Sequence, residues 1–141
     1  MSTKGLLYTK KKIVFKEGEV IFKEEEEGGG MEMYFIDSGR VNIVKKVGDT
    51  DATLTTLDEG DFFGEMSLIT GNKRSASAIA QTNCKLHTMD KETFEFNLSN
   101  DINFMRQILE TLANRLEDAD TNLKRHIQRS ARLSKVFNVT G

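Results

Sequence analysis

Residues 62–76 read FFGEMSLITGNKRSA, and this stretch carries the most information about the fold and function of the chain. Gly64 has no side chain, so its backbone can lie close to a ligand. The four residues after it are enough for one helical turn, whose unpaired N–H groups favour an anion. After a turn at Gly71 and Asn72, Arg74 can return alongside, and its planar guanidinium suits two phosphate oxygens. With the hydroxyl of Ser75 as a further donor, the stretch predicts a small anion site.

Glu65 indicates that this anion belongs to a sugar phosphate. A carboxylate repels a phosphate, but it accepts hydrogen bonds from sugar hydroxyls, as acidic residues do at nucleotide ribose. One anion beside one hydroxyl donor describes a sugar with a single phosphate. The stretch has neither the Gly-Lys-Ser/Thr of a Walker loop nor the Gly-x-Gly of a dinucleotide site. On these residues alone, a structural turn with Arg74 paired to an acid such as Glu65 is the alternative.

Short strands separated by turn residues surround this stretch. Apolar or alternating runs precede it at residues 13–15, 20–22, 31–35 and 41–44, and a Thr-rich strand contains Leu54 and Leu57. Two more runs follow, at residues 75–80 and 84–88. Gly39 lies in a turn signal and is free to take a positive φ. Short strands at near-regular spacing are typical of a β-sandwich or barrel.

Two helices follow the strands. Asp90 is placed to cap a short helix, and Asn100 or Asp101 to cap a much longer one. Apolar residues along the longer helix are spaced alternately by four and three: Met105, Leu109, Leu112, Leu116, Ala119 and Leu123, then less regularly His126, Ser130, Leu133 and Phe137. This heptad stripe predicts a coiled-coil seam and a homodimer. One amphipathic helix packed on its own domain is the alternative.

Length and composition limit the classes of protein. The chain has 141 residues, enough for one domain, and its 20 Lys+Arg against 22 Asp+Glu give no overall basic field for nucleic acid. Cys84 is the only cysteine, and no signal peptide or membrane span is present, so we expect a cytoplasmic location. His87 and His126 are too far apart in sequence to suggest a cupin-type metal enzyme.

Two charged segments are interpreted as solvated. Residues 24–27 are all glutamate and precede three glycines, which predicts an exposed loop. Basic residues without an acid among them follow Asp120 on the long helix: Lys124, Arg125, Arg129, Arg132 and Lys135. They suit the C-terminal end of the helix dipole, and contact with nucleic acid or a partner is the alternative.

The segment with Gly64, Glu65 and Arg74 resembles the phosphate-binding cassette of cyclic nucleotide-binding domains. Similar residues recur at 18–22, 33–36, 38–41, 60–61 and 84–86, and the layout resembles regulators like the catabolite activator protein. The resemblance implies a mainly β fold, a double-stranded β-helix or jelly roll over about residues 13–89. A short helix and a long C-terminal dimerisation helix would follow over about residues 90–137, within a single domain of residues 1–141.

The resemblance also implies roles for individual residues. Glu65 matches the glutamate that binds the ribose, and Arg74 matches the arginine that binds the phosphate. Arg115 matches an arginine on the long helix that supports this glutamate, and Asp120 matches a position that contacts the base. The other residues of the predicted binding site are close to the phosphate: Gly64, Met66, Ser67, Ser75 and Ala76. Lys73 departs from the family, because many members have proline before the arginine.

The resemblance implies a stand-alone regulatory module that binds cyclic AMP or cyclic GMP. No enzyme activity, cofactor or metal is expected, and the ligand-dependent change would pass to a separate protein effector. Cyclic AMP is favoured by its frequency in the family, with cyclic GMP open. The helix-turn-helix domain of the resembling transcription factors is absent from the sequence, so DNA binding is not expected. Because the sequence has no long apolar stretch, a membrane partner is not expected either. The alternative is a dimeric interaction module of the same fold with an empty pocket or another small anion.

Overall fold

The computed structural model describes the backbone of residues 11–27 and 31–137, and the side chains of these residues as far as residue 133. The chain divides into two compact units, with the boundary between Asn100 and Asp101. The first unit contains the predicted strands and the short helix, and the second contains the long helix.

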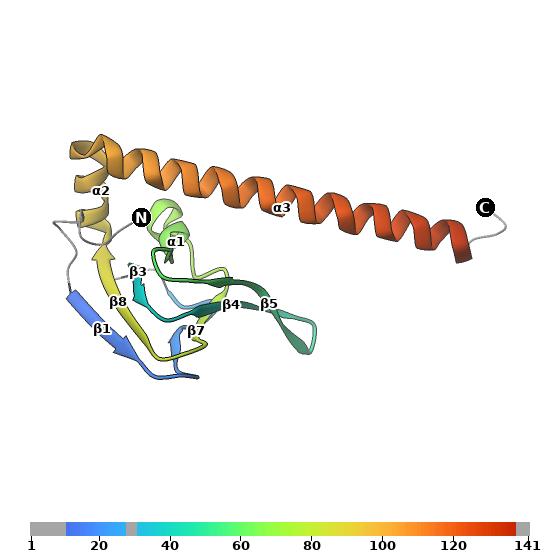
Figure 1. The fold of residues 1–141 in the computed structure, drawn as a ribbon, viewed down its shortest axis with the longest axis horizontal. Coiled ribbons are helices and arrows are strands. Elements are labelled where there is room, and N and C mark those ends of the chain that lie inside the picture. Colours follow the sequence, from blue (N-terminus) through green and yellow to red (C-terminus); the bar gives the residue numbers. More distant parts are fainter. Residues whose placement is uncertain (1–10, 28–30, 138–141) are drawn as a thin grey trace. The chain divides into compact units, whose positions relative to one another are not determined.

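Among the described residues, eight short strands form two antiparallel four-stranded sheets (Figure 1). The first sheet has the order β1 (Lys11–Phe15), β8 (Cys84–Asp90), β3 (Glu32–Ser38) and β6 (Phe62–Phe63). The second has the order β2 (Val20–Phe22), β7 (Ser77–Ala80), β4 (Val41–Val47) and β5 (Thr50–Leu57). Strands far apart in the sequence are neighbours in both sheets, as in a jelly roll. The predicted mainly β fold is confirmed.

A hydrophobic core lies inside the roll and takes residues from both sheets. Its buried members are Phe22, Ile36, Val41, Leu57, Phe63, Ala78, Ala80, Cys84 and Leu86. Cys84 is the small buried residue that the sequence predicts, and its Sγ donates to the carbonyl oxygen of Arg40 at 3.2 Å. Gly39 has a φ of 96°, and a Cβ there would collide with the carbonyl oxygen of Asn83. Glycine is therefore required at this turn.

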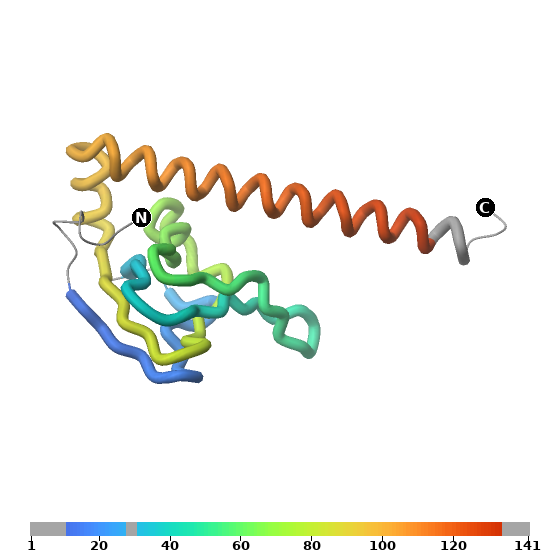
Figure 2. The backbone as a smooth tube through the Cα atoms, in the orientation of Figure 1, coloured from blue at the N-terminus to red at the C-terminus, as the bar shows by residue number. Residues whose placement is uncertain are grey.

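Two short helices belong to the first unit. Figure 2 shows the backbone leaving β6, passing through α1 (Glu65–Thr70) and returning to β7. Helix α2 (Lys91–Asn100) follows β8 directly, and Asp90 Oδ1 accepts a hydrogen bond from the Thr93 N–H at 2.8 Å. This is the cap that the sequence predicts.

Helix α3 (Ile102–Phe137) has 36 residues and forms the second unit. Asp101, rather than Asn100, caps it: its Oδ1 accepts the N–H groups of Asn103 at 3.0 Å and Phe104 at 3.1 Å. The heptad stripe is largely open in the single chain, with Leu116 72% exposed and Leu109 and Leu123 more than half exposed. No helix within the described residues is both long and apolar enough to cross a membrane.

Candidate functional site

The site begins where β6 turns into α1. Phe62 and Phe63 are buried and pair with β3, which anchors the end of the strand. Gly64 then takes a φ of 81°, a left-handed conformation that lets the chain turn into the helix. A Cβ on Gly64 would lie 2.9 Å from Arg74 Nη1 and 3.3 Å from Cε2 of Phe22. Both the backbone conformation and the lack of space therefore require glycine.

Arg74 returns to the start of α1. Its side chain is 4% exposed, with Nη1 donating to the Gly64 carbonyl oxygen at 2.8 Å and Nη2 donating to the Glu32 carbonyl oxygen at 2.7 Å. The structure thus brings the guanidinium and the first turn of α1 together. These two bonds leave further guanidinium N–H donors for a ligand.

An aromatic cluster lies beneath the guanidinium. Cζ of Arg74 is 4.0 Å from the ring centroid of Phe22, a cation–π distance. Tyr34 stacks on Phe63 with ring centroids 5.2 Å apart, and Phe22 is 6.0 Å from the Tyr34 ring. The site residues predicted from the sequence do not include Phe22, Tyr34 or Glu32. They are 52, 40 and 42 positions from Arg74, and only their strand periodicity is visible locally.

Charge and burial oppose each other at this position. Burial lowers the pKa of the Arg74 guanidinium, because a charged group loses hydration inside the protein. The neighbouring charges of Glu26, Glu65 and Glu32 act in the opposite direction and favour the cation. Burial raises the pKa of the Tyr34 phenol, and the positive charge of Arg74 partly offsets this effect. The cation is thus held in a partly dehydrated, acid-flanked environment.

The glutamate segment joins the backbone of Arg74. The N–H of Glu25 donates to the Arg74 carbonyl oxygen at 2.8 Å, and the Arg74 N–H donates to the Glu26 carbonyl oxygen at 3.1 Å. Glu24 donates its N–H to Ser77 Oγ at 2.9 Å. The predicted exposed loop is confirmed for residues 25–27, and the backbone of residues 24–26 in addition supports the site, which the sequence did not predict. Residues 28–30 lie outside the described residues.

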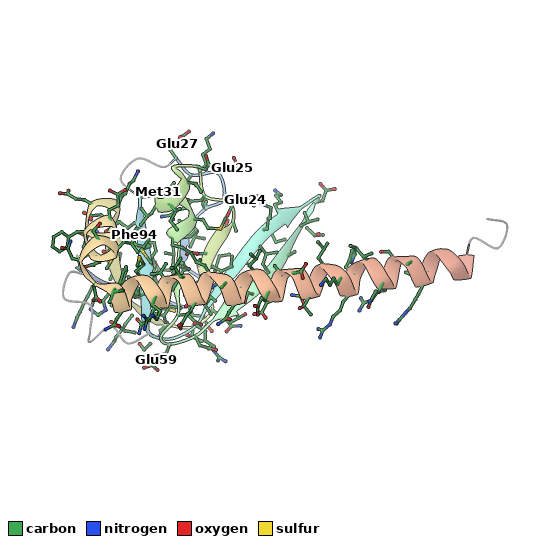
Figure 3. The ribbon with its side chains drawn as sticks, turned by 90° about the horizontal axis from the view of Figure 1, so that it is seen from above. Glu24, Glu25, Glu27, Met31, Glu59 and Phe94 are labelled. Carbon is green, nitrogen blue, oxygen red and sulfur yellow. The ribbon has the colours of Figure 1, made fainter. Side chains whose placement is uncertain are left out.

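Side chains of the same segment meet lysines. Glu24 is half-buried, and its Oε2 is 3.6 Å from Lys45 Nζ, which also donates to the Ser75 carbonyl oxygen at 2.7 Å. Glu27 is exposed (Figure 3). Its Oε1 lies 3.5 Å from Lys73 Nζ. Lys45 and Lys73 therefore balance part of the acidic charge. Both lysines are distant from the glutamates in the sequence, so local sequence patterns do not predict these ion pairs.

The remaining predicted site residues differ in their surroundings. Glu65 and Ser67 are buried in α1, whereas Met66 is exposed on the same helix. Ala76 is buried and Ser75 is exposed. Arg115 and Asp120 both lie on α3, in the second unit, where Asp120 Oδ2 is 3.1 Å from Lys124 Nζ. The ligand roles of all these residues stay predictions.

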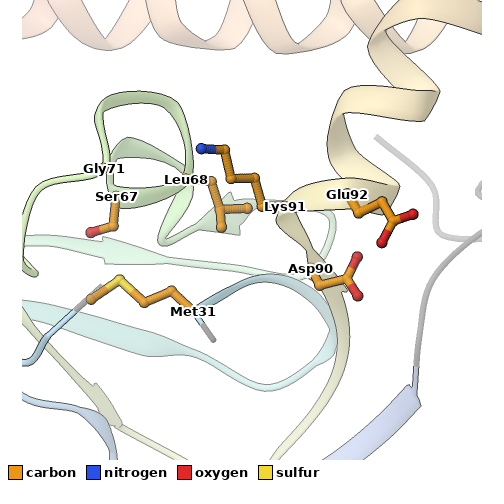
Figure 4. Close-up of a pocket in the computed structure, with 7 residues that line it drawn as sticks. All are labelled: Met31, Ser67, Leu68, Gly71, Asp90, Lys91 and Glu92. Carbon is orange, nitrogen blue, oxygen red and sulfur yellow. The ribbon is translucent and has the colours of Figure 1, made fainter. Parts of the chain in front are cut away.

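A separate hollow lies between α1 and the junction of β8 with α2 (Figure 4). Its volume is about 240 Å³, and the residues that line it are Met31, Ser67, Leu68, Gly71, Asp90, Lys91 and Glu92. The Lys91 side chain extends toward α1 in this view. Neither Arg74 nor Glu65 lines this hollow, so it is distinct from the surroundings of the buried guanidinium.

A family model matches the part of the chain that forms this site. The model of the cyclic nucleotide-binding domain matches residues 12–101, which include every strand, α1 and α2 except the first residue of β1. The chain belongs to this family. The resemblance of residues 62–76 to a cyclic nucleotide-binding domain is thereby confirmed, together with the regulatory class of the family.

Curated relatives come from kinase regulation and ion channels. The cAMP-dependent protein kinase regulatory subunit of Schizosaccharomyces pombe is 35% identical over 94 residues, covering 67% of this chain and 22% of the relative. The human potassium/sodium hyperpolarization-activated cyclic nucleotide-gated channel 3 is 34% identical over 100 residues, covering 71% of this chain and 12% of the channel. This cyclic nucleotide-binding domain therefore spans less than a quarter of either relative.

Solved structures support the fold. The Thermus thermophilus catabolite activator protein matches with a TM-score of 0.72 and 30% identity, covering 81% of this chain and 53% of that chain. The EAL enzyme Bd1971 matches in a cAMP-bound form (TM-score 0.60, 28% identity, 89% of this chain and 33% of that chain). It also matches in a cGMP-bound form (TM-score 0.59, 30% identity, 75% and 28%).

Proposed function

We propose that the roll binds a cyclic mononucleotide and acts as a regulatory module. The observation that carries this proposal is the position of Arg74, buried and hydrogen-bonded to Gly64 at the start of α1. Its free N–H donors and the backbone N–H groups after Gly64 would hold the cyclic phosphate. Glu65, buried in the first turn of α1, would accept a hydrogen bond from the ribose hydroxyl. Family membership and the names of the relatives support this assignment.

The electrostatics favour a ligand with one negative charge. The guanidinium already loses hydration on folding, so a charge-assisted hydrogen bond to phosphate gains strength without a further large desolvation cost. Such a bond contributes about 1.5–3 kcal/mol. The charges of Glu26, Glu65 and Glu32 act on the same cation, and we expect them to disfavour a phosphate that carries a second negative charge. A cyclic phosphodiester, with a single charge, fits this environment better than a phosphate monoester.

Titration calorimetry with cyclic AMP, cyclic GMP, 5′-AMP and inorganic phosphate tests the proposal. We expect the cyclic nucleotides to bind, and the two controls without a cyclic phosphodiester, 5′-AMP and inorganic phosphate, to bind far more weakly. Arg74→Ala should weaken cyclic nucleotide binding by roughly 100-fold or more, because it removes the buried cation. Arg40 is exposed and provides the matched control, since Arg40→Ala removes the same charge elsewhere. Near wild-type binding by a folded Arg74→Ala protein would reject the proposal.

The choice of base is part of the proposal. We favour cyclic AMP, because the regulatory subunit from S. pombe is named for cAMP and one neighbouring structure is cAMP-bound. Cyclic GMP is the second candidate, because the same EAL enzyme matches in a cGMP-bound form. Asp120 is proposed to contact the base, and the titrations should therefore be repeated with Asp120→Ala. A change in the ratio of the two affinities is expected, and an unchanged ratio would remove Asp120 from the base site.

The output of the module is proposed to pass through α3. Its exposed apolar stripe supports a homodimer, and a change in this helix on ligand binding would be read by a separate protein effector. A cytoplasmic location fits the unpaired, buried Cys84. An interaction module with another small anion would instead show dimerisation without any response to the four ligands of the titration.

A further inference from the structure

We propose that Phe22 is a positioning residue for Arg74: its ring and the Glu32 carbonyl fix the guanidinium in a binding-ready orientation before any ligand arrives. This inference rests on the proposed function, because it assigns the device that prepares the phosphate-binding cation. Phe22 is one of residues 18–22, which resemble the family, but the resemblance assigns it no role. The structure assigns it a contact with the functional side chain.

Three elements hold the guanidinium from different sides. The Gly64 carbonyl, just before α1, accepts from Nη1 at 2.8 Å, and the Glu32 carbonyl on β3 accepts from Nη2 at 2.7 Å. Both bonds lie at the edge of the guanidinium, where its N–H groups point. Cζ of Arg74 lies over the Phe22 ring of β2, 4.0 Å from the ring centroid. Two hydrogen bonds and one ring contact together restrain the position of the guanidinium.

The ring contact offsets part of the desolvation cost of burying the charged guanidinium, which the two carbonyl groups do not fully compensate. Arg74 is 4% exposed, and burial lowers its pKa by disfavouring the charged form. The negative face of an aromatic ring attracts a cation most strongly when both are shielded from water, as here. A flexible arginine that is immobilised on folding also avoids losing that freedom when the ligand binds. The ring should therefore increase affinity through Arg74 without touching the ligand.

The ring itself is held firmly. Phe22 is 7% exposed and lies 6.0 Å from the Tyr34 ring and 5.9 Å from the Phe63 ring. Its strand, β2, pairs with β7, and Phe22 is opposite Ala78, four residues after Arg74. The strand that follows the arginine in sequence is thus hydrogen-bonded to the strand that carries the ring. Arg74 and Phe22 are positioned by the same sheet.

The test compares side chains of similar size at position 22. Phe22→Leu keeps an apolar side chain but removes the aromatic face, and we expect cyclic nucleotide affinity to fall about tenfold. Phe22→Tyr keeps the face and should remain within about threefold of wild type. Phe35→Leu is the matched control, because Phe35 is also buried and points to the opposite face of β3 from Tyr34. It should lower thermal stability but leave affinity unchanged.

A double-mutant cycle identifies the route of the effect. The tenfold loss on Phe22→Leu should shrink to less than about twofold in an Arg74→Lys background, because the planar group on the ring is then missing. An equal loss in both backgrounds would overturn the proposal. If Phe22→Leu does not fold, Phe22→trifluorophenylalanine replaces it, since it keeps the ring shape and weakens the negative face. A fluorinated protein with unchanged affinity would also overturn the proposal.

A measurement without nucleotide separates this inference from the proposed function. In the ligand-free protein, a guanidinium over a ring has side-chain N–H resonances that the ring current shifts. We expect this NMR shift for Arg74 in the wild type and its loss in Phe22→Leu. If no cyclic nucleotide binds the wild type but the shift is present, the proposed function fails while Phe22 still positions Arg74. If nucleotide binds and the shift is absent, the positioning role is wrong.

Discussion

A single buried guanidinium links the stability of the roll to its proposed ligand. Arg74 contacts the carbonyl oxygens of Gly64 and Glu32, which belong to segments far apart in the sequence. Its donors therefore cross-link the fold before they serve a ligand. A variant at this position changes both properties, and experiments at single residues must measure stability and binding side by side.

Glu65 should recognise the ribose hydroxyl. Glu65→Gln keeps the shape but weakens the acceptor, and we expect cyclic AMP affinity to fall roughly tenfold, less than for Arg74→Ala. Titration with 2′-deoxy cyclic AMP identifies the partner, because this ligand lacks the hydroxyl. Wild type should prefer the ribose form, and Glu65→Gln should lose most of this preference. Exposed Glu59 supplies the control, and Glu59→Gln should retain the wild-type preference.

Substitutions at Gly64 and Gly71 distinguish the cost of backbone strain from the cost of steric crowding by an added Cβ. Both have left-handed φ values, 81° and 77°, but a Cβ on Gly71 would meet nothing within 4 Å. Gly71→Ala should therefore cost only the conformational strain, about 1 kcal/mol of unfolding free energy. Gly64→Ala should cost at least about 1 kcal/mol more, because its Cβ would displace Arg74, and it should also weaken nucleotide binding. Urea unfolding of the two variants measures the difference, and equal losses would contradict this account.

We expect the buried phenol of Tyr34 to make the folded protein less stable at alkaline pH. Burial raises the pKa of this phenol in the folded state. As the pH rises, the unfolded chain therefore releases the phenol proton before the folded protein does, at about pH 10. The resulting stabilisation is complete below that pH and disappears as the pH rises through the folded pKa. We expect the unfolding free energy to fall less between about pH 8 and about pH 11 in Tyr34→Phe than in wild type. Identical profiles would mean that the phenol is not held neutral.

At the scale of elements, α1 and α3 differ in how much of their apolar surface the chain itself buries. Helix α1 is short and has its ends fixed by two left-handed glycines, with Glu65, Ser67 and Leu68 buried. Helix α3 has an apolar stripe of which Leu109, Leu116 and Leu123 are more than half exposed. A single long helix gains little stability alone, and most helices depend on burying such a face. The stripe is therefore the element for which a second copy is proposed.

Leu116→Asp tests the proposed dimer. A charge in the seam should weaken self-association at least tenfold, because an unpaired carboxylate would be buried between the two helices. Asn114 is exposed and faces away from Leu116 on the helix, so Asn114→Asp adds the same charge outside the seam. Analytical ultracentrifugation should give a dimer for wild type and Asn114→Asp, and a monomer for Leu116→Asp at the same concentration. Equal masses for all three proteins would contradict a dimer through this stripe.

At the scale of the whole molecule, the proposed phosphate site and the proposed dimer seam belong to different units, and the proposed base contact of Asp120 belongs to the second unit. The family match ends at residue 101, next to the boundary between the roll unit and the helix unit. The buried guanidinium and its supports belong to the first unit, and the proposed dimer seam belongs to the second. A ligand can shift the second unit only if it binds more tightly to one of its arrangements. Comparing the dimer dissociation constant with and without cyclic nucleotide would measure this coupling directly.

Local patterns in the sequence determined much of this protein. Alternating and apolar runs predicted seven of the eight described strands but not β6, Asp90 and Asp101 marked the starts of the two longer helices, and residues 62–76 identified the family. These features depend on neighbouring residues, because backbone propensity, capping and a short motif are local properties. The sequence also indicated that Gly64 and Arg74 belong to one site.

Only the tertiary structure decided what surrounds Arg74. The Phe22 ring, the Glu32 carbonyl and the backbone of residues 24–26 reach it through pairing of strands that are distant in the chain. Such contacts depend on sheet order and register, which a glutamate run or an apolar strand does not encode locally. For this reason the glutamate run predicts the exposed loop that residues 25–27 form, but it does not predict that the backbone of residues 25 and 26 supports the arginine.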